Sequence, residues 1–158
     1  GPAGDAIKRL EAALNQLMDI SVTSPNAQAI GKLSSEVLIE ALHIHTLQAP
    51  HIAESSDTEM DKIEAEMKRR EERADQAFDS LNDLVEEAGR PYLTAARTAF
   101  RDFREINTQV IDLSRQNSNV RSFAISLGQK RKVTAQCLDS LAALEKAVKE
   151  SMTFRATR

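Results

Sequence analysis

Apolar side chains recur every three or four residues through four long stretches of this chain. In the first stretch the pattern begins with Ile7, Leu10, Leu14 and Leu17. That spacing places them on one face of an α-helix, because a helix completes a turn about every 3.6 residues. None of the four stretches shows the sustained alternation of apolar and polar residues that a β-strand requires. The pattern therefore predicts an all-α protein built from long amphipathic helices.

Breaks in the pattern separate four predicted helices. The sequence has only five Gly and four Pro among 158 residues, so it offers few places to turn. Ser56 or Asp57 is the expected N-cap of the second helix, Gly89 its C-cap, and Pro91 is expected in the first turn of the third. The first helix is expected to kink near Pro25, because proline disrupts a helix interior. The predicted helices cover about residues 5–51, 57–88, 91–115 and 120–154.

Four such helices joined by short turns predict an up-down-up-down antiparallel four-helix bundle that fills residues 5–158 as one domain. Residues 1–4, Gly-Pro-Ala-Gly, resemble the remnant of a protease-cleavage site and are left out of this domain. Both ends of the chain would lie at one end of a rod, which suits a domain inserted between two membrane spans. No apolar run reaches the roughly 18 residues that cross a bilayer, so we expect those spans to lie outside this sequence.

Charge and composition disfavour several kinds of partner and site. The formal net charge is -3 with both signs interspersed, which gives no basic surface for nucleic acid. The single cysteine, Cys137, excludes an internal disulfide and is expected to be a small core residue. His43 and His45 diverge around a helix, and neither has a histidine four residues away to complete a helical zinc pair. We therefore predict no metal, no cofactor and no enzyme activity.

Polar residues interrupt the apolar faces of the predicted helices. Glu40 and Arg70 take seam positions, and a turn near residue 55 would bring them opposite each other, where such a pair fixes register. Asn107, Lys130 and Thr134 take similar positions further along the chain. An unpartnered buried polar group costs about 1–3 kcal/mol. These positions therefore predict a wet interior, internal partners or a pocket for a polar ligand in the half of the rod away from its termini.

Basic side chains gather where the predicted third and fourth helices meet. A guanidinium can bind a carboxylate bidentately, so these cations are candidates for holding a carboxylate ligand. The alternative is that they are solvated and neutralised by acidic neighbours. With the seam residues and one histidine, the residues expected to contact a ligand are His43, Arg104, Asn107, Arg115, Arg121, Lys130 and Thr134.

Three stretches together resemble a known family. They are a helix break with an acidic helix start, Ala53–Glu66, the run Val110–Ser122, and its continuation Ala124–Arg131. Over about residues 6–155 the chain resembles the four-helix-bundle sensor domain of bacterial methyl-accepting chemotaxis proteins. The resemblance implies a periplasmic domain of an inner-membrane receptor that binds a small organic or amino acid and signals across the membrane. It also implies a homodimer through the first and last helices, with Phe154–Arg158 leading into a membrane span.

One departure from the family affects the expected ligand. Amino-acid sensors of this kind carry several arginines on the distal part of the first helix, whereas Glu40–His51 contains none. This counts against an aspartate-like binding mode and leaves a citrate-like or aromatic carboxylate compatible. Two other interpretations stay open. The sensor domain of a histidine kinase shares the fold, and a helical adaptor or scaffold protein would show the same periodicity.

Overall fold

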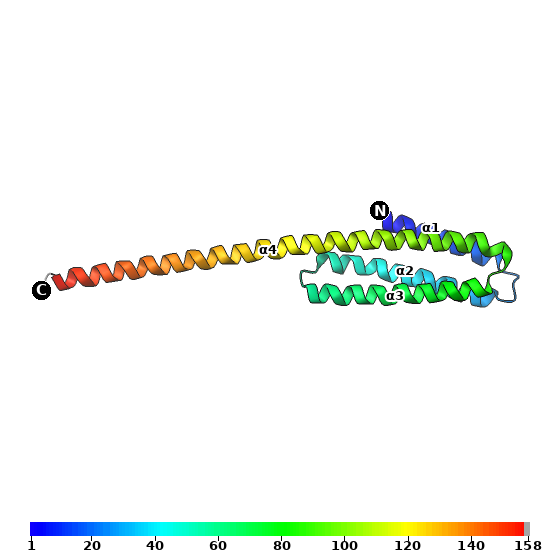
Figure 1. Cartoon of the computed structure of the whole chain (residues 1–158), viewed down its shortest axis with the longest axis horizontal. Coiled ribbons are helices and arrows are strands. Elements are labelled where there is room, and N and C mark those ends of the chain that lie inside the picture. The colour runs from blue at the N-terminus through cyan, green and yellow to red at the C-terminus, as the bar shows by residue number, and fades with distance from the viewer. Residues whose placement is uncertain (157–158) are drawn as a thin grey trace. The chain divides into compact units, whose positions relative to one another are not determined.

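A computed structural model describes the backbone of residues 1–156 and the side chains of residues 1–152. These residues form four α-helices and one 3-10 turn, without any strand, which confirms the all-α prediction. The helices are α1 (Pro2–Ile20), α2 (Ala27–Ala53), α3 (Asp57–Leu84) and α4 (Arg90–Ala156), with η1 (Glu87–Gly89) directly before α4 (Figure 1). No helix in this part of the chain is long and apolar enough to cross a membrane.

The chain divides into two units, residues 1–118 and residues 119–158. The first contains α1, α2, α3, η1 and the first part of α4, and we name it the bundle. The second contains the rest of α4, and we name residues 119–152 the C-terminal helix segment. Thr157 and Arg158, and the side chains of Phe154–Ala156, lie outside the described residues, so the predicted lead into a membrane span is not described.

The predicted first helix consists of two helices. α1 ends at Ile20, and residues 21–26 turn the chain before α2 begins at Ala27. Within this turn the Ser24 hydroxyl accepts a hydrogen bond from the Asn26 backbone N–H at 3.1 Å, and Pro25 has no N–H to offer to a helix. Instead of a kink near Pro25, the chain turns and α2 packs against α1.

The predicted break between the third and fourth helices does not occur. α4 runs without interruption through the polar run Ser114–Asn119. Serine weakens a helix when its hydroxyl competes for the helix's own backbone groups. Here Ser114 and Ser118 instead donate to the carbonyl oxygens of His51 and Ser55, on other segments, at 3.0 and 3.3 Å. The predicted fourth helix is therefore a continuation of the third.

The start of α3 agrees with the sequence prediction. Ser56 is its N-cap, and the Ser56 hydroxyl accepts a hydrogen bond from the Glu59 backbone N–H at 3.5 Å. Asp57 and Glu59 place negative charge in the first turn, where the helix dipole favours it. Pro91 lies in the first turn of α4, also as predicted. Each of these features depends on a few neighbouring residues, which is why the sequence could predict them.

Gly89 has a different role from the predicted helix C-cap. α3 already ends at Leu84, and Gly89 closes the 3-10 turn without a positive φ. A Cβ atom at this position would lie 2.7 Å from Val85 Cγ1 and 3.0 Å from Leu17 Cδ1. Position 89 needs a glycine because the turn before α4 packs closely against α1 and leaves no room for a Cβ atom. Beside it, Asn26 Nδ2 donates to the Leu84 carbonyl oxygen at 3.3 Å and joins the two turns.

One apolar core joins the four helical segments of the bundle. On the surface, Arg9 of α1 and Asp102 of α4 form an ion pair with Nη1 and Oδ2 2.8 Å apart. The predicted stripe of α1 is buried throughout and supplies much of the core. The largest fully buried side chains include Leu10, Leu14, Leu17, Ile30, Ile44, Met67, Phe78, Leu81 and Phe103.

Candidate functional site

The interior of the bundle changes from apolar to polar along its length. Near the turn between α1 and α2 the core is aliphatic and aromatic, as at Leu17, Phe78 and Leu81. Towards the turn between α2 and α3, polar side chains occupy buried positions, and we name this part the polar half. Its buried polar residues are Glu40, Gln48, His51, Asn107, Ser114 and Ser118.

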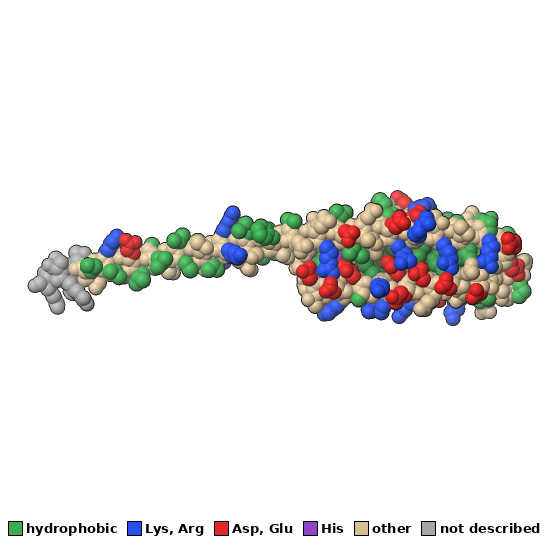
Figure 2. All heavy atoms as spheres, in the orientation of Figure 1, with side chains coloured by type: hydrophobic (Ala, Val, Ile, Leu, Met, Phe, Trp, Pro, Cys, Tyr) green, Lys and Arg blue, Asp and Glu red, His purple; other side chains and the backbone are tan. Residues whose placement is uncertain are grey.

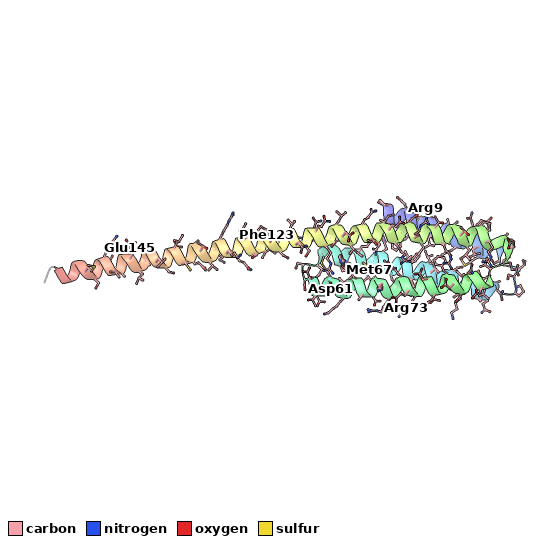
Figure 3. The ribbon with its side chains drawn as sticks, viewed as in Figure 1. Arg9, Asp61, Met67, Arg73, Phe123 and Glu145 are labelled. Atoms are coloured by element: carbon pink, nitrogen blue, oxygen red, sulfur yellow. The ribbon has the colours of Figure 1, made fainter. Side chains whose placement is uncertain are left out.

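Polar residues of α2 and α4 pair inside the bundle. Gln48 Nε2 donates to Asn107 Oδ1 at 2.9 Å, and Asn107 Nδ2 lies 3.7 Å from the sulfur of Met67 on α3, which Figure 3 labels. Burying an amide without a partner would be unfavourable, and this pairing gives each of the two amides a partner. The predicted seam position of Asn107 is confirmed, and its partner is the unpredicted Gln48.

His51 lies at the centre of a polar cluster inside the polar half. Its side chain is fully buried, with Nδ1 2.9 Å from Ser114 Oγ and Nε2 2.7 Å from Glu64 Oε1. Hydrolases use the same three types of group in a row. Here, however, Ser114 is only 2% exposed and donates its hydroxyl hydrogen to the His51 carbonyl oxygen. The cluster is therefore arranged to join α2, α3 and α4, and its serine is not open to a substrate.

Arg115 connects this cluster to the first turns of α3. Its Nε lies 2.7 Å from Glu64 Oε1, its Nη1 lies 3.4 Å from Asp57 Oδ1, and its Nη2 contacts Asp61, which Figure 3 labels. Burial alone raises the pKa of Glu64, but hydrogen bonds from Arg115 and His51 outweigh it and hold that pKa below its ordinary value. Hydrogen bonds to Glu64 and Asp61 raise the pKa of Arg115 in turn. The guanidinium is therefore already bound to carboxylates of the protein.

Arg70 is paired in a similar way. Its Nη1 lies 3.2 Å from Glu40 Oε2, which confirms the predicted meeting of these two seam residues. The same nitrogen lies 2.7 Å from His43 Nδ1, so the exposed His43 faces an arginine across α2 and α3. The hydrogen bond that Arg70 donates to Glu66, with a smaller contribution from the one to Glu40, raises the pKa of Arg70.

Arg104 also contacts acidic residues of α3. Its Nε lies 3.2 Å from Glu71 Oε2, and its Nη1 lies 3.2 Å from Asp75 Oδ2. Its guanidinium carbon lies 5.9 Å from the centre of the Phe100 ring. Burial raises the pKa of Glu71, an effect that Arg104 opposes. A ligand carboxylate at Arg104 would therefore compete with two acidic side chains already in place.

The other three predicted site residues, Arg121, Lys130 and Thr134, lie in the C-terminal helix segment, where all three are exposed. The Thr134 hydroxyl donates to the Lys130 carbonyl oxygen at 2.9 Å along the same helix. The prediction that Lys130 and Thr134 belong to a seam inside the bundle was wrong, because it depended on a break in α4 that does not exist. Cys137, the predicted core residue, is exposed for the same reason.

A groove opens on the polar half, beside the start of α1. It has a volume of about 430 Å³ and is walled by α1, α2 and α4. Gln48 and His45 line it from α2, and the His45 ring stands edge-on to buried Phe103, with the ring centres 6.5 Å apart. Apolar walls with a few polar groups are typical of small-molecule sites. The lining residues are Gly1, Pro2, Ala3, Gly4, His45, Gln48, Ile106, Gln109, Val110 and Leu113.

Sequence reasoning missed this groove. It left residues 1–4 out of the domain, although they line the groove and Pro2–Gly4 belong to α1. It also treated α1 and α2 as one helix, and a straight continuation would not bring the start of α1 beside α2 and α4. The glutamines Gln48 and Gln109 also gave no signal, because a lone amide on a helix is usually a solvated side chain.

Comparison of the chain with family models, with curated proteins and with solved structures gives no match.

Proposed function

We propose that the bundle is the extracytoplasmic ligand-binding sensor domain of a bacterial chemoreceptor and that ligand binding in the groove produces a signal carried across the membrane. The observation that supports this proposal is the groove itself, where α1, α2 and α4 meet over the buried Gln48–Asn107 pair. A ligand that contacts three helices favours one arrangement of them over another. α4 continues beyond the groove to Ala156, so a shift of this helix could be passed along it.

Within this proposal the helices of the bundle follow an up-down-up-down course. Contacts between α2 and α3 support it, because Glu40 contacts Arg70 while the later His51 contacts the earlier Glu64. Contacts between α3 and α4 run in the same antiparallel sense, from the pair of Asp75 and Arg104 to that of Asp61 and Arg115. Such a bundle brings ligand-sensitive helices side by side over their whole length.

The ligand we propose is a small organic acid or amino acid that is recognised mainly through amide groups. The arginines first expected to hold it, Arg104 and Arg115, already contact protein carboxylates. The groove offers Gln48, Gln109 and His45 instead. An amide side chain presents both a donor and an acceptor, so it can bind a carboxylate, a hydroxyl or an amide of the ligand.

A thermal-shift screen of organic acids and amino acids on the whole chain tests this proposal. A ligand of the groove raises the melting temperature, because it binds the folded chain only. Gln109→Ala should weaken its binding about tenfold, as expected for one lost hydrogen bond of about 1.4 kcal/mol. Gln116→Ala, on an exposed site of α4 outside the groove, is the matched control and should bind normally. A panel without any stabilising compound, or equal losses in both variants, would contradict the proposal.

Two other functions compete with this one. The sensor domain of a histidine kinase would use the same groove in the same way, and only the domain that receives the signal distinguishes the two. A helical adaptor is favoured by a different observation, the exposed apolar side chains of the C-terminal helix segment. An adaptor predicts binding of a protein partner and no stabilisation by small molecules, so the thermal-shift screen separates it from a sensor.

A further inference from the structure

The C-terminal helix segment exposes an apolar face along its whole length. Every side chain described between residues 119 and 152 is exposed, including Phe123 at 71% and both Leu141 and Leu144 at 61%. Figure 2 shows apolar side chains distributed along this part of α4. Most of the stability of a helix in a protein comes from burial of one face, and backbone hydrogen bonds alone leave it marginal in water. We therefore expect another protein surface to cover this apolar face.

The spacing of the exposed residues is that of a coiled coil. Seam positions alternate three and four residues apart through five heptads, with an a position at residue 120 and a d position at residue 123. Seven of the ten seam residues are apolar, which is typical of the seam between two supercoiled helices. The a positions are Val120, Leu127, Thr134, Leu141 and Val148, and the d positions are Phe123, Lys130, Cys137, Leu144 and Ser151.

We propose that this face packs against the same face of a second copy of the chain, as a parallel, in-register, two-stranded coiled coil over residues 120–151. The first argument comes from the residues that flank the seam. In a parallel pair each g position lies beside the e position five residues later on the other helix. These pairs match in polarity along the segment: Ser126 with Arg131, Val133 with Leu138, Ser140 with Glu145, and Ala147 with Met152.

An antiparallel pair does not match in this way. Aligning a positions with d positions of a reversed copy places Phe123 opposite Val148 and Leu127 opposite Leu144, which are apolar pairs. The flanking positions then pair apolar side chains with charged or polar ones. The mismatched pairs are Ala124 with Glu145, Arg131 with Leu138, and Val133 with Ser140. Complementarity of the flanking residues therefore favours the parallel arrangement.

The polar centre of the seam supports a defined register. Lys130 and Thr134 occupy two consecutive seam positions. A polar residue at such a position lowers stability but selects one alignment and a low number of strands. The long stem of lysine lets its ammonium group reach water at the edge of the seam. The inference depends on residues 119–152 alone and holds whether or not the groove of the bundle binds a ligand.

Interchain cross-linking of the whole chain tests the parallel register. Oxidised glutathione serves as the oxidant, and Cys137 itself is replaced, because it lies near its own copy in both the parallel and the antiparallel arrangement. The informative pair of variants is Cys137→Ser with Leu144→Cys, at a d position, and Cys137→Ser with Lys146→Cys, on the outer face. The first should form the linked dimer and the second should not. In an antiparallel pair Leu144 would face Leu127, about 25 Å away along the helix from its own copy, so absence of the Leu144→Cys dimer would overturn the proposal.

Sedimentation equilibrium gives an independent measurement. The unmodified chain should be a dimer, and Leu141→Asp should raise the dimer dissociation constant about 100-fold or more, because each dimer loses two buried leucines. Ile125→Asp makes the same kind of change on the outer face and should alter the constant less than about threefold. A chain that stays monomeric at every concentration, that forms trimers or tetramers, or that responds equally to both substitutions would refute the proposal.

Discussion

The buried cluster around His51 makes the sharpest prediction about stability. His51→Ala removes the hydrogen bond to the Glu64 carboxylate at 2.7 Å and the one to the Ser114 hydroxyl at 2.9 Å. The first is worth about 1.5–3 kcal/mol because its partner is charged, and the second about 0.5–1.5 kcal/mol. The shorter side chain also leaves a cavity, because His51 is fully buried. We therefore expect the free energy of unfolding to fall by about 3–5 kcal/mol.

Urea unfolding followed by tyrosine fluorescence measures this change in the bundle. The chain has one tyrosine and no tryptophan, and Tyr92 lies in the part of α4 that belongs to the bundle, so the signal excludes unfolding of residues 119–152. Lys32→Ala is the matched control, because Lys32 is exposed on the same helix away from the cluster, and should change stability by less than about 0.5 kcal/mol. If His51→Ala does not fold, His51→Gln, which can keep one hydrogen bond, supplies the measurement.

A double-mutant cycle separates the cluster from simple loss of packing. Glu64→Gln alone weakens the contacts of the carboxylate with His51 and Arg115. The double variant should be less destabilised than the sum of the single variants by about 1 kcal/mol or more, because both remove the same hydrogen bond. Strict additivity, or a His51→Ala variant as stable as the unmodified chain, would refute the reasoning that His51 joins three helices through charged and polar contacts.

Two further predictions follow from local contacts. The pKa of Glu64 is lowered from its ordinary value of 4.5, so its contribution to stability is complete above about pH 4.5 and is lost as the pH falls through the lower folded-state value. In urea titrations the stability difference between the unmodified chain and Glu64→Gln should therefore shrink as the pH falls through that range. A difference that stays constant with pH would contradict the assignment. Gly89→Ala should destabilise the bundle by about 1–3 kcal/mol, because the added Cβ would overlap Val85. Gly31→Ala, inside α2 with open space around it, should instead stabilise the bundle by about 0.5–1 kcal/mol. Equal changes in the melting temperatures of the two variants would show that close packing at Gly89 is unimportant.

Several features of the bundle could be predicted because they depend on neighbouring residues. The stripe of α1, the N-cap at Ser56 and the early proline of α4 all follow from residues within one or two turns. The meeting of Glu40 and Arg70 could also be predicted, because a turn near residue 55 fixes which residues of α2 and α3 lie opposite each other. The candidate site was harder to predict. Arg115 and Arg104 have the chemistry of ligand-binding residues, but the acidic residues that neutralise them come from α3, up to 58 positions away.

The amino-acid sequence by itself determined most of the helical stretches and which side of each is apolar, because these properties arise largely from interactions within a few residues. The tertiary structure decided which apolar faces meet. Leu14 and Leu141 stand in similar three-and-four patterns, yet Leu14 is 1% exposed inside the bundle and Leu141 is 61% exposed. Likewise the polar run Ser114–Asn119 continues a helix because its serines bond to carbonyl groups more than 60 residues away. Periodicity shows that a face needs a partner, but the partner is set by contacts between distant parts of the chain.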